Sequence, residues 1–585
     1  MSQLRTLFRL TFAIALAGMA AGEGRAQSVS PFAGGAWCGN VTPTTATVKV
    51  RLASPGLAAR LALATNARLD GATYTASVVS SGANGNIVTF NLSGLEPHTA
   101  YHYGVEVSGV LRDEAVSRGR FRSFPRGAGS FKLALIGDGD PRDPDSRVHD
   151  AVAAEDPLLL LYNGDLHYGD ITTTVVEDYR AMLDAVLNHP GQGALFRSAP
   201  VAYVWDDHDF SGGNNSDGTA PGGAAATTAY RERVPHYPIG PVDGTIGQAF
   251  TVGRVRVIMT DLRSAASPAS LPEGRAKTKL GAGQKAWLKE QLVAARDAAF
   301  PLIIWMSPVP WIAPAAPGDD SWGGYATERA EIADFIRDNR IRNLVIFSGD
   351  MHALAYDDGA HSDYATGGGA PLIVLHATPL TRDGNAKGGP YTAGPFLGTQ
   401  QYGILEVTDT GGATVQCRFR GMRLDEGAKF IVPFSASAAS VETRSGAPAD
   451  TTERVLVNIS ARGRLASAGD SLVAGFVVAG KSPRTLLMRA VGPSLTAFGV
   501  SDAIALPMIS LYRGPALVAS NENWSLLDSP RLTAAFDRVG AFRLAGAGSR
   551  DAALLLTLEP GAYTVQATNL ARSAGSVLLE VYEVP

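Results

Sequence analysis

The chain has 585 residues, enough for roughly three or four domains, and 45% of them are hydrophobic, so a sizeable core is possible. Its formal net charge is −4 and it contains no long basic tract, which argues against nucleic acid or an anionic membrane as a binding partner. The two cysteines, Cys38 and Cys417, show no zinc-binding spacing. They form either one disulfide or two buried thiols, and the sequence favours neither.

The N-terminus has the pattern of a secretory signal peptide over residues 1–26. Arg5 and Arg9 precede the apolar run Leu10–Ala21, and small residues around Ala26 offer a cleavage site. A membrane anchor is the weaker alternative, because the run is shorter than the ~20 residues of a spanning helix. The pattern predicts a protein that is secreted, periplasmic or at the cell surface.

Residues 28–127 are predicted to form a small β-sandwich. Ala46, Val48 and Val50 alternate with polar residues, and Gly, Pro and Asn interrupt the alternating runs at short intervals. The segment 92–103, LSGLEPHTAYHY, resembles the turn-and-strand signature of fibronectin type III domains. The resemblance implies a fibronectin III-like N-terminal domain.

Five short apolar runs between residues 131 and 347 are each followed by acidic or histidine residues. The runs are Phe131–Ile136, Leu158–Tyr162, Val201–Trp205, Val255–Met259 and Leu344–Phe347. Such runs are typical of strands buried on both faces. Helical patterns at Thr172–Asn188, Gln284–Ala298 and Thr327–Asn339 alternate with them, so residues 128–425 are predicted to be an α/β domain. Ligands of α/β folds gather where the strands end.

The residues at these strand ends suit a metal centre. They are Asp138, Asp165, Asp207, Asp350 and His352. Carboxylates brought close together without a cation would repel and raise each other's pKa. Oxygen ligands with one imidazole suit Fe, Mn, Ca or Zn, and a set of this size can hold two ions. Two ions about 3.5–4 Å apart are a common device for hydroxide attack on phosphorus.

The order of these motifs resembles the calcineurin-like metallophosphoesterase superfamily, and within it the alkaline phosphatase D (PhoD-like) family. The matching segments are Gly164–Tyr168, Trp205–Asp209, Asp261–Arg263, Gln284–Leu288, Asp320–Arg329 and Ser348–His352. The resemblance implies a sandwich of two mixed sheets flanked by helices over residues 128–425. It also implies a metal-dependent phosphoric ester hydrolase.

The resemblance assigns roles to individual residues. Asp165 would bridge two ions; Asp138, His352 and the phenolate of Tyr168 would complete the first ion, and Asp207 and Asp350 would hold the second. His208 would face the phosphate as a hydrogen-bond donor or general acid. Arg263 would clamp phosphate oxygens, with a structural ion pair as the alternative.

Two departures from the family pattern bear on the metal. Asp138-Gly139-Asp140 stands where the superfamily has Asp-x-His, without the cysteine frequent in this family, and Ser307 stands where the superfamily has a lone histidine. The more oxygen-rich set favours iron with calcium, with manganese or zinc as alternatives. Asp140 is either a further ligand or part of a turn.

Other polar and aromatic residues near these motifs are assigned lesser roles. Asp206 and Asp209 are expected to cap a helix or support the ligands, and His149, His167, His189 and His236 are expected not to be ligands. Trp287 and Leu288 are predicted core residues. Trp322, Tyr325 and Arg329 line either the pocket or the core, and the Gly-rich loop Gly212–Thr227 either controls access to the site or is plain surface.

The C-terminal third has no predicted catalytic residues. Residues 426–452, rich in Ser, Ala, Thr and Pro, are predicted to be a linker. Residues 453–585 contain short strand-like runs, including Gly475–Val478 and Val577–Val581, and resemble a β-sandwich found at the C-terminal ends of secreted bacterial proteins. That resemblance implies attachment to the cell envelope or display on it.

These features predict a secreted, metal-dependent phosphoesterase that hydrolyses extracellular phosphomonoesters or phosphodiesters by attack of a metal-activated hydroxide. Its partner would be a small phosphate ester rather than nucleic acid, and a monomer is the default state. Two alternatives stay open: a phospholipase-like phosphodiesterase, and a surface adhesion or display protein without catalysis.

Overall fold

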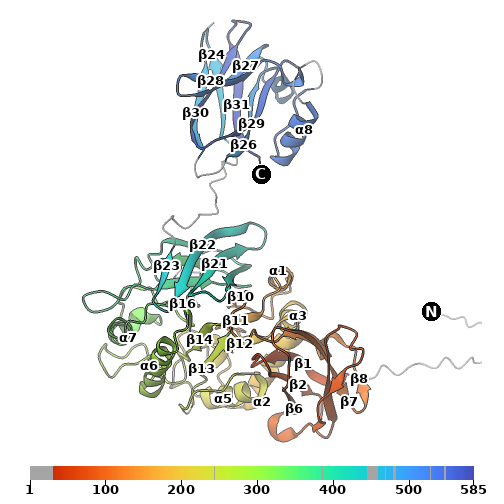
Figure 1. Cartoon of the computed structure of the whole chain (residues 1–585), viewed down its shortest axis with the longest axis vertical. Helices are drawn as coiled ribbons and strands as arrows, with labels where there is room; N and C mark the ends of the chain where they lie inside the picture. Colours follow the sequence, from red (N-terminus) through yellow and green to blue (C-terminus); the bar gives the residue numbers. More distant parts are fainter. Residues whose placement is uncertain are drawn as a thin grey trace, which may run out of the picture. The chain divides into compact units, whose positions relative to one another are not determined.

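The structure, a computed structural model, describes residues 30–242, 244–384, 387–443, 459–467, 469–478, 483–526, 529–545 and 549–584. The chain divides into two compact units, residues 1–448 and 449–585, each with hydrophobic clusters of its own (Figure 1). The predicted signal peptide lies outside the described residues. Among the helices of the described residues, none has the length and apolar character needed to cross a membrane.

A ten-stranded sheet runs through the first unit in the order β23-β22-β21-β20-β10-β11-β12-β1-β2-β6. Its parallel centre is β10 (Phe131–Ile136), β11 (Leu159–Asn163), β12 (Val201–Val204) and β1 (Phe32–Gly39). Antiparallel strands flank it: β20 (Gln401–Thr408), β21 (Thr414–Arg423), β22 (Gly427–Ser437), β23 (Ser440–Thr443), β2 (Ala46–Leu52) and β6 (Ile87–Leu92). The sheet is therefore mixed.

A second, seven-stranded mixed sheet has the order β13-β14-β15-β16-β18-β17-β19. Its strands are β13 (Gln248–Val252), β14 (Val255–Met259), β15 (Leu302–Ser307), β16 (Leu344–Ser348), β17 (Ala353–Asp357), β18 (Ile373–Ala377) and β19 (Ala393–Leu397). Val257, Ile304 and Val345 share one core with Leu133 and Leu160 of the first sheet, so the two sheets pack face to face.

Helices cover the outer faces of the two sheets. They are α1 (Arg147–Ala154), α2 (Val176–Asn188), α3 (Pro190–Ser198), α5 (Gly223–Arg233), α6 (Ala282–Asp297) and α7 (Ala326–Asp338). The four-residue helix α4 (Asp207–Phe210) follows the end of β12. Leu288 of α6 and Ile332 of α7 pack with Ile303 on the far face of the second sheet, and Trp287 and Leu288 are core residues as predicted. The predicted sandwich of two mixed sheets flanked by helices is confirmed.

The N-terminal strands belong to the same body as the α/β region. β1, β2 and β6 extend the ten-stranded sheet, while β3 (Ala58–Ala64), β4 (Thr73–Tyr74), β5 (Val78–Val79), β7 (Ala100–Val107), β8 (Val110–Leu111) and β9 (Arg118–Arg122) form another sheet. Gly39 makes the junction with Val201 of β12, where a Cβ would lie 2.7 Å from the Val201 carbonyl oxygen. Residues 30–122 thus contribute strands to two different sheets. The likeness to a fibronectin III domain stays a prediction.

The predicted linker is wrong over residues 427–443, which form β22 and β23. Phe430, Val432, Phe434 and Ala436 point inward at every second position of β22. This period-two pattern is that of a strand with one buried face. The high Ser and Ala content of residues 426–452 led to the prediction of a linker despite this alternation. Residues 444–452 lie outside the described part of the chain.

The two cysteines are free and buried. Cys38 lies in β1 and Cys417 in β21, with four strands of the same sheet between them. Neighbouring strands are about 4.8 Å apart, so the two residues are separated by more than the roughly 7 Å that a disulfide allows. Of the two possibilities that the sequence left open, two buried thiols is the one observed.

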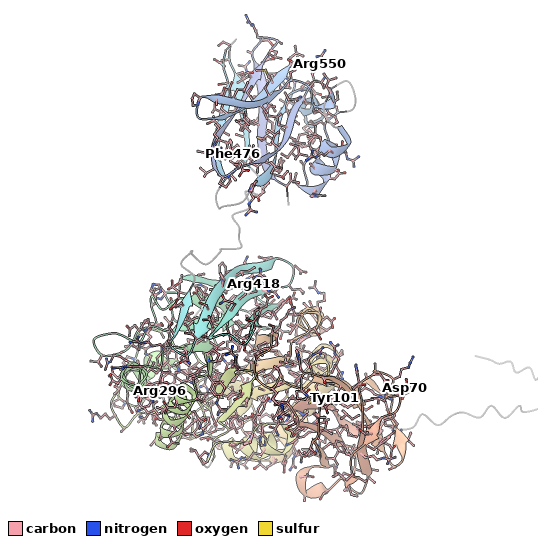
Figure 2. The ribbon with its side chains drawn as sticks, in the orientation of Figure 1. Asp70, Tyr101, Arg296, Arg418, Phe476 and Arg550 are labelled. Carbon is pink, nitrogen blue, oxygen red and sulfur yellow. The ribbon has the colours of Figure 1, made fainter. Side chains whose placement is uncertain are left out.

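The second unit is a β-sandwich, as predicted. One sheet holds β24 (Ile459–Leu465), β31 (Gly575–Glu583), β26 (Arg484–Val491) and β29 (Ala552–Leu558). The other holds β25 (Leu472–Val478), β30 (Gly561–Asn569), β27 (Pro507–Arg513) and β28 (Ala516–Asn521), and α8 (Ser529–Arg538) adds one helix. Phe476, labelled in Figure 2, belongs to this unit. Its ring stacks on that of Tyr563 with centroids 5.7 Å apart.

A buried histidine predicts that acid destabilises the first unit. His376 of β18 is fully buried, neither ring nitrogen has a hydrogen-bond partner, and burial lowers its pKa to about 3. Below the usual histidine pKa of about 6.5 the unfolded chain takes up a proton that the folded chain refuses, so the free energy of unfolding falls as the pH drops. From pH 7 to 4.5 the loss through this group is about 3 kcal/mol.

Urea unfolding of metal-free protein at the two pH values measures this effect. His376→Phe is expected to lose correspondingly less stability than wild type on acidification. His98→Asn, at an exposed position with φ 54°, is the control and should behave as wild type. Equal acid sensitivity of His376→Phe and wild type would contradict the assignment.

Candidate metal centre

The predicted ligands come together where strands of both sheets end. Asp138 follows β10, Asp165 follows β11, and Asp207 begins α4 just after β12. Asp350 and His352 follow β16 of the second sheet. The face-to-face packing of the two sheets therefore brings five predicted ligands to one place.

Four of these residues have left-handed backbone conformations. The φ angles are 53° at Asp138, 52° at Asp165, 62° at Asp350 and 48° at His352. Such angles are uncommon for residues other than glycine and persist only where the surrounding fold holds them. Their occurrence at four of the five ligand positions indicates that the loops are shaped to aim these side chains inward.

Three overlapping groups of side chains could each hold an ion. They are Asp138, Asp165 and His352; Asp165, Asp207 and His208; and Asp206, Asp207 and Asp350, with ligand atoms within 4.8 Å of one another in each group. Asp165 and Asp207 each belong to two groups, which is the arrangement that bridging requires. Tyr168 lies beside the first group, with its hydroxyl 2.9 Å from His352 Nε2.

Several buried carboxylate oxygens in these groups have no hydrogen-bond partner. They are both oxygens of Asp138 and one oxygen, Oδ2, each of Asp165, Asp206 and Asp350. Buried polar atoms are ordinarily satisfied, and a buried carboxylate without a partner is costly. Metal ions would supply the missing partners, so the donor set fits a metal centre.

Burial also raises the pKa of these carboxyl groups. It is the main cause of the raised pKa of Asp138, of Asp165 and of Asp350, and the neighbouring charge of Asp207 raises the pKa of Asp165 and Asp350 further. At Asp207 burial acts in the same direction, but Arg263, His208 and the Asn215 N–H outweigh it and the pKa is lowered. A bound cation would favour the ionised form of every member.

His208 is oriented by a carboxylate that the sequence did not single out. Its Nδ1 lies 2.6 Å from Oδ1 of Asp170, and its ring lies 4.3 Å from the Tyr168 ring between centroids. The backbone N–H of His208 also donates to Asp165 Oδ1 at 3.3 Å. Asp170 follows the Gly164–Tyr168 motif by two residues, and its place beside that motif was the available signal.

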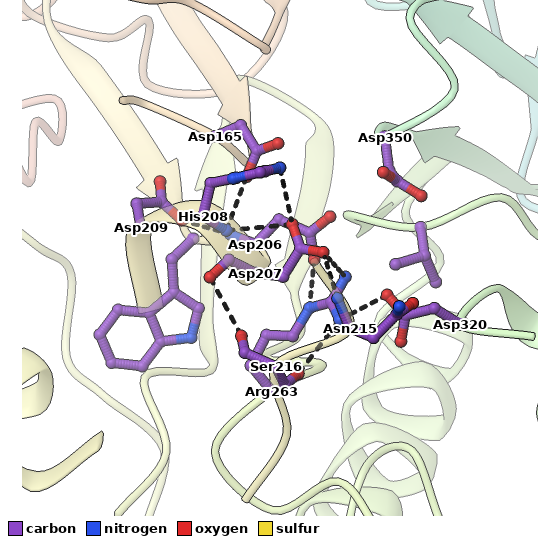
Figure 3. Close-up of polar contacts among 12 residues, drawn as sticks. Asp165, Asp206, Asp207, His208, Asp209, Asn215, Ser216, Arg263, Asp320 and Asp350 are labelled. Carbon is purple, nitrogen blue, oxygen red and sulfur yellow. Dashed lines mark hydrogen bonds and ion pairs between the residues drawn. The ribbon is translucent and has the colours of Figure 1, made fainter. Parts of the chain in front are cut away.

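Arg263 makes the contacts of a structural ion pair. Its side chain is fully buried, with Nε 2.5 Å from Asp206 and Nη1 2.6 Å from Asp320 (Figure 3). Lys279 pairs with the other oxygen of Asp320 at 2.7 Å. The guanidinium therefore holds the loop after β14 to the residues around α4. These contacts match the structural alternative that the sequence left open. Arg263 Nη2 is buried without a hydrogen-bond partner, and the contact with phosphate oxygens stays a prediction.

The family comparison covers the centre of the chain. Residues 146–392 match the family model described as PhoD-like phosphatase. This central region belongs to the PhoD-like phosphatase family. Asp138 lies just before the matched residues, so it is the fold that places Asp138 with the other ligands.

Two relatives agree with the family match. Alkaline phosphatase D of Bacillus subtilis (strain 168) is 23% identical over 324 residues, covering 46% of this chain and 54% of that protein. The chain thus matches about half the length of this curated relative. A solved structure of PhoD aligns with a TM-score of 0.56 and 18% identity over 72% of this chain and 93% of its own chain. This likeness shows a shared fold.

The remaining residues around the PhoD-like site have structural contacts. Asp206 and Asp209 form a capping box at the start of α4, as expected. Asp140 pairs with Arg142 at 2.7 Å and Arg382 at 3.2 Å and lies outside the three groups, so its contacts match the turn alternative. Trp322, Tyr325 and Arg329 are buried, and Arg329 donates to the carbonyls of Trp311 and Ala313.

The structure also places other residues that the sequence analysis discussed. His149, His167, His189 and His236 lie outside the three groups. The loop Gly212–Thr227 reaches the site, because the Asn215 N–H donates to Asp207 Oδ2 at 2.8 Å and the Ser216 hydroxyl donates to the Asp207 carbonyl at 3.0 Å. Sequence reasoning missed Lys387, whose ammonium lies 2.5 Å from Asp350.

Proposed function

We propose that the protein is a metal-dependent phosphoesterase that hydrolyses extracellular phosphomonoesters or phosphodiesters. The observation that carries the proposal is the set of overlapping groups that share Asp165 and Asp207 and hold unpartnered buried oxygens. Membership of the central region in the PhoD-like phosphatase family supports the same chemistry. A non-catalytic adhesion protein would have no need to keep these costly carboxylates buried together.

Each residue of the centre has a distinct proposed task. Asp138, Asp165 and His352, with Tyr168 beside them, would hold one ion, and Asp165, Asp207 and Asp350 would hold the other. Bound ions would neutralise phosphate charge and supply an activated water. His208, fixed by Asp170, would donate a hydrogen bond to the phosphate or a proton to the leaving oxygen. Iron with calcium suits this oxygen-rich set, with manganese or zinc as alternatives.

The cellular setting is a proposal that rests on the ends of the chain. The signal-like N-terminus supports export to the periplasm, the cell surface or the medium. The C-terminal β-sandwich would attach the monomeric enzyme to the cell envelope, and its substrate would be a small phosphate ester rather than nucleic acid. Cell fractionation of the full chain and of a variant that ends at residue 448 tests the attachment.

Metal removal is expected to abolish activity. Metal analysis of the purified protein by mass spectrometry should find between one and two ions per chain. Dipicolinate treatment should reduce p-nitrophenyl phosphate turnover at least about 100-fold, because the ions supply both the nucleophile and the charge neutralisation. Adding back iron, calcium or manganese should restore the activity. A metal-free protein that stays inactive after these additions would overturn the proposal.

Substrate choice separates the alternatives that remain. Turnover of bis-p-nitrophenyl phosphate or phosphatidylcholine well above that of p-nitrophenyl phosphate would identify a phosphodiesterase of the phospholipase-like kind. The reverse order would identify a phosphomonoesterase.

A further inference from the structure

The ion-binding groups differ in whether a cationic side chain already occupies them. Within the described residues, no lysine or arginine forms an ion pair with Asp138 or Asp165, and His352 lies 3.9 Å from Asp138. Both Asp138 oxygens and Asp165 Oδ2 are unpartnered. An ion can therefore enter the group of Asp138, Asp165 and His352 without displacing a positive charge.

The group of Asp206, Asp207 and Asp350 already contacts two positive charges. Arg263 Nε lies 2.5 Å from Asp206, and its Nη2 lies 3.8 Å from Asp207. Lys387 Nζ lies 2.5 Å from Asp350 Oδ1. A divalent ion bound by Asp207 and Asp350 would lie beside both charges in a buried place, where repulsion is strong. One of the two cationic groups must withdraw before the ion binds well.

Exposure decides which of the two can withdraw. The Arg263 side chain is fully buried and is held by Asp206 and Asp320 together. The Lys387 side chain is 39% exposed, and its ammonium has one carboxylate partner, Asp350. A lysine has a long flexible stem and a strongly hydrated ammonium, so it can turn into solvent at small cost. Lys387 is therefore the group that an incoming ion displaces.

We propose that Lys387 is a built-in counter-cation that occupies the place of the second ion and sets its affinity. The group of Asp138, Asp165 and His352 binds an ion tightly. The second position, which Asp165, Asp207 and Asp350 form in the proposed function, binds one weakly because Lys387 must leave Asp350 first. This inference rests on the metal centre of the proposed function. It implies that the second position fills and empties with the ambient ion concentration while the first stays occupied.

Calorimetric titration of metal-free protein with Mn²⁺ alone tests the inference. Wild type should bind two ions with affinities about 100-fold apart or more. Lys387→Met should tighten the second ion about tenfold or more and leave the first within about threefold, because it removes the competing charge. Lys387→Arg keeps that charge and should behave as wild type.

Arg382→Met is the matched control. Arg382 has a similar side-chain exposure of 41%, pairs with Asp140 and lies over the Tyr168 ring. The substitution therefore removes a nearby positive charge without freeing Asp350. It should leave the affinity of the second ion within about threefold of wild type. Equal tightening in Arg382→Met and Lys387→Met would show a general charge effect and overturn the specific role of Lys387.

The remaining outcomes are also decisive. One ion in wild type and two in Lys387→Met would be the extreme form of the expected result. A second ion that is unchanged or weaker in Lys387→Met would overturn the inference. Because the titration needs no turnover, a clear Lys387 effect in a protein that hydrolyses no phosphate ester would refute the proposed function and leave the inference standing. A wild type that binds no Mn²⁺ would overturn both.

Discussion

Asp165→Asn is expected to empty the metal centre and abolish phosphoester hydrolysis. Asp165 is the fully buried member shared by two of the ion-binding groups, and its Oδ2 has no other partner. The amide has the same shape but no charge, so both positions lose their common ligand. We expect less than about 0.2 ions per chain after dialysis and a fall in kcat/KM of at least about 10³, since the bound ions supply the main catalytic effect.

The same variant should gain stability when metal-free. Burial and the charge of Asp207 raise the pKa of Asp165, which means that the metal-free fold bears a cost for this carboxylate. Removing it should raise the free energy of unfolding by about 1 kcal/mol or more at pH 7.5. If Asp165→Asn loses its ions while the metal-free protein is more stable than metal-free wild type, the loss of ions cannot be due to misfolding. Asp165 would then be a metal ligand.

Asp140→Asn is the matched control for Asp165→Asn. Asp140 lies on the same edge of the sheet, but its carboxylate is bound by Arg142 and Arg382. It should keep its ions and most of its activity. If Asp140→Asn lost ions as fully as Asp165→Asn, Asp140 would be a ligand after all, and an Asp165→Asn protein that kept its ions would refute the central assignment.

The strands that carry the ligands could be predicted because they are buried on both faces. The apolar runs Phe131–Ile136 and Val255–Met259 coincide with β10 and β14. A strand between two packed layers needs apolar residues on both sides, which leaves a continuous run in the sequence. The acidic residues then stand out, because a carboxylate directly after such a run must either reach solvent or find a cation.

Features set by distant parts of the chain could not be predicted. Lys387 reaches Asp350 from a loop 37 residues further along the chain, and nothing local marks it as a partner. Whether Arg263 faces a phosphate or Asp206 and Asp320 depends on how the loop after β14 packs, and the motif Asp261–Arg263 is compatible with both. For β22 the local signal was present, because apolar residues alternate along the strand. The high Ser and Ala content of the segment led instead to the prediction of a linker.

His208→Ala is expected to lower kcat about 10²–10³-fold while the ions stay bound. His208 Nδ1 is held by Asp170 at 2.6 Å, which leaves Nε2 for the substrate, 4.0 Å from Asp207 Oδ1. Because His208 also belongs to one of the ion-binding groups, metal analysis must accompany the kinetics. Loss of an ion in His208→Ala would make His208 a ligand and refute its proposed contact with the phosphate.

The leaving group distinguishes the two roles proposed for His208. p-Nitrophenolate leaves without a proton, whereas an alkoxide such as that of glycerol phosphate needs one in the transition state. If His208 is the general acid, His208→Ala should impair glycerol phosphate hydrolysis at least about tenfold more than p-nitrophenyl phosphate hydrolysis. If it donates a hydrogen bond to a phosphate oxygen, both substrates should suffer equally, since they carry the same phosphate. Asp170→Asn keeps the imidazole but weakens its orientation, so it should reproduce the same substrate pattern with a smaller loss.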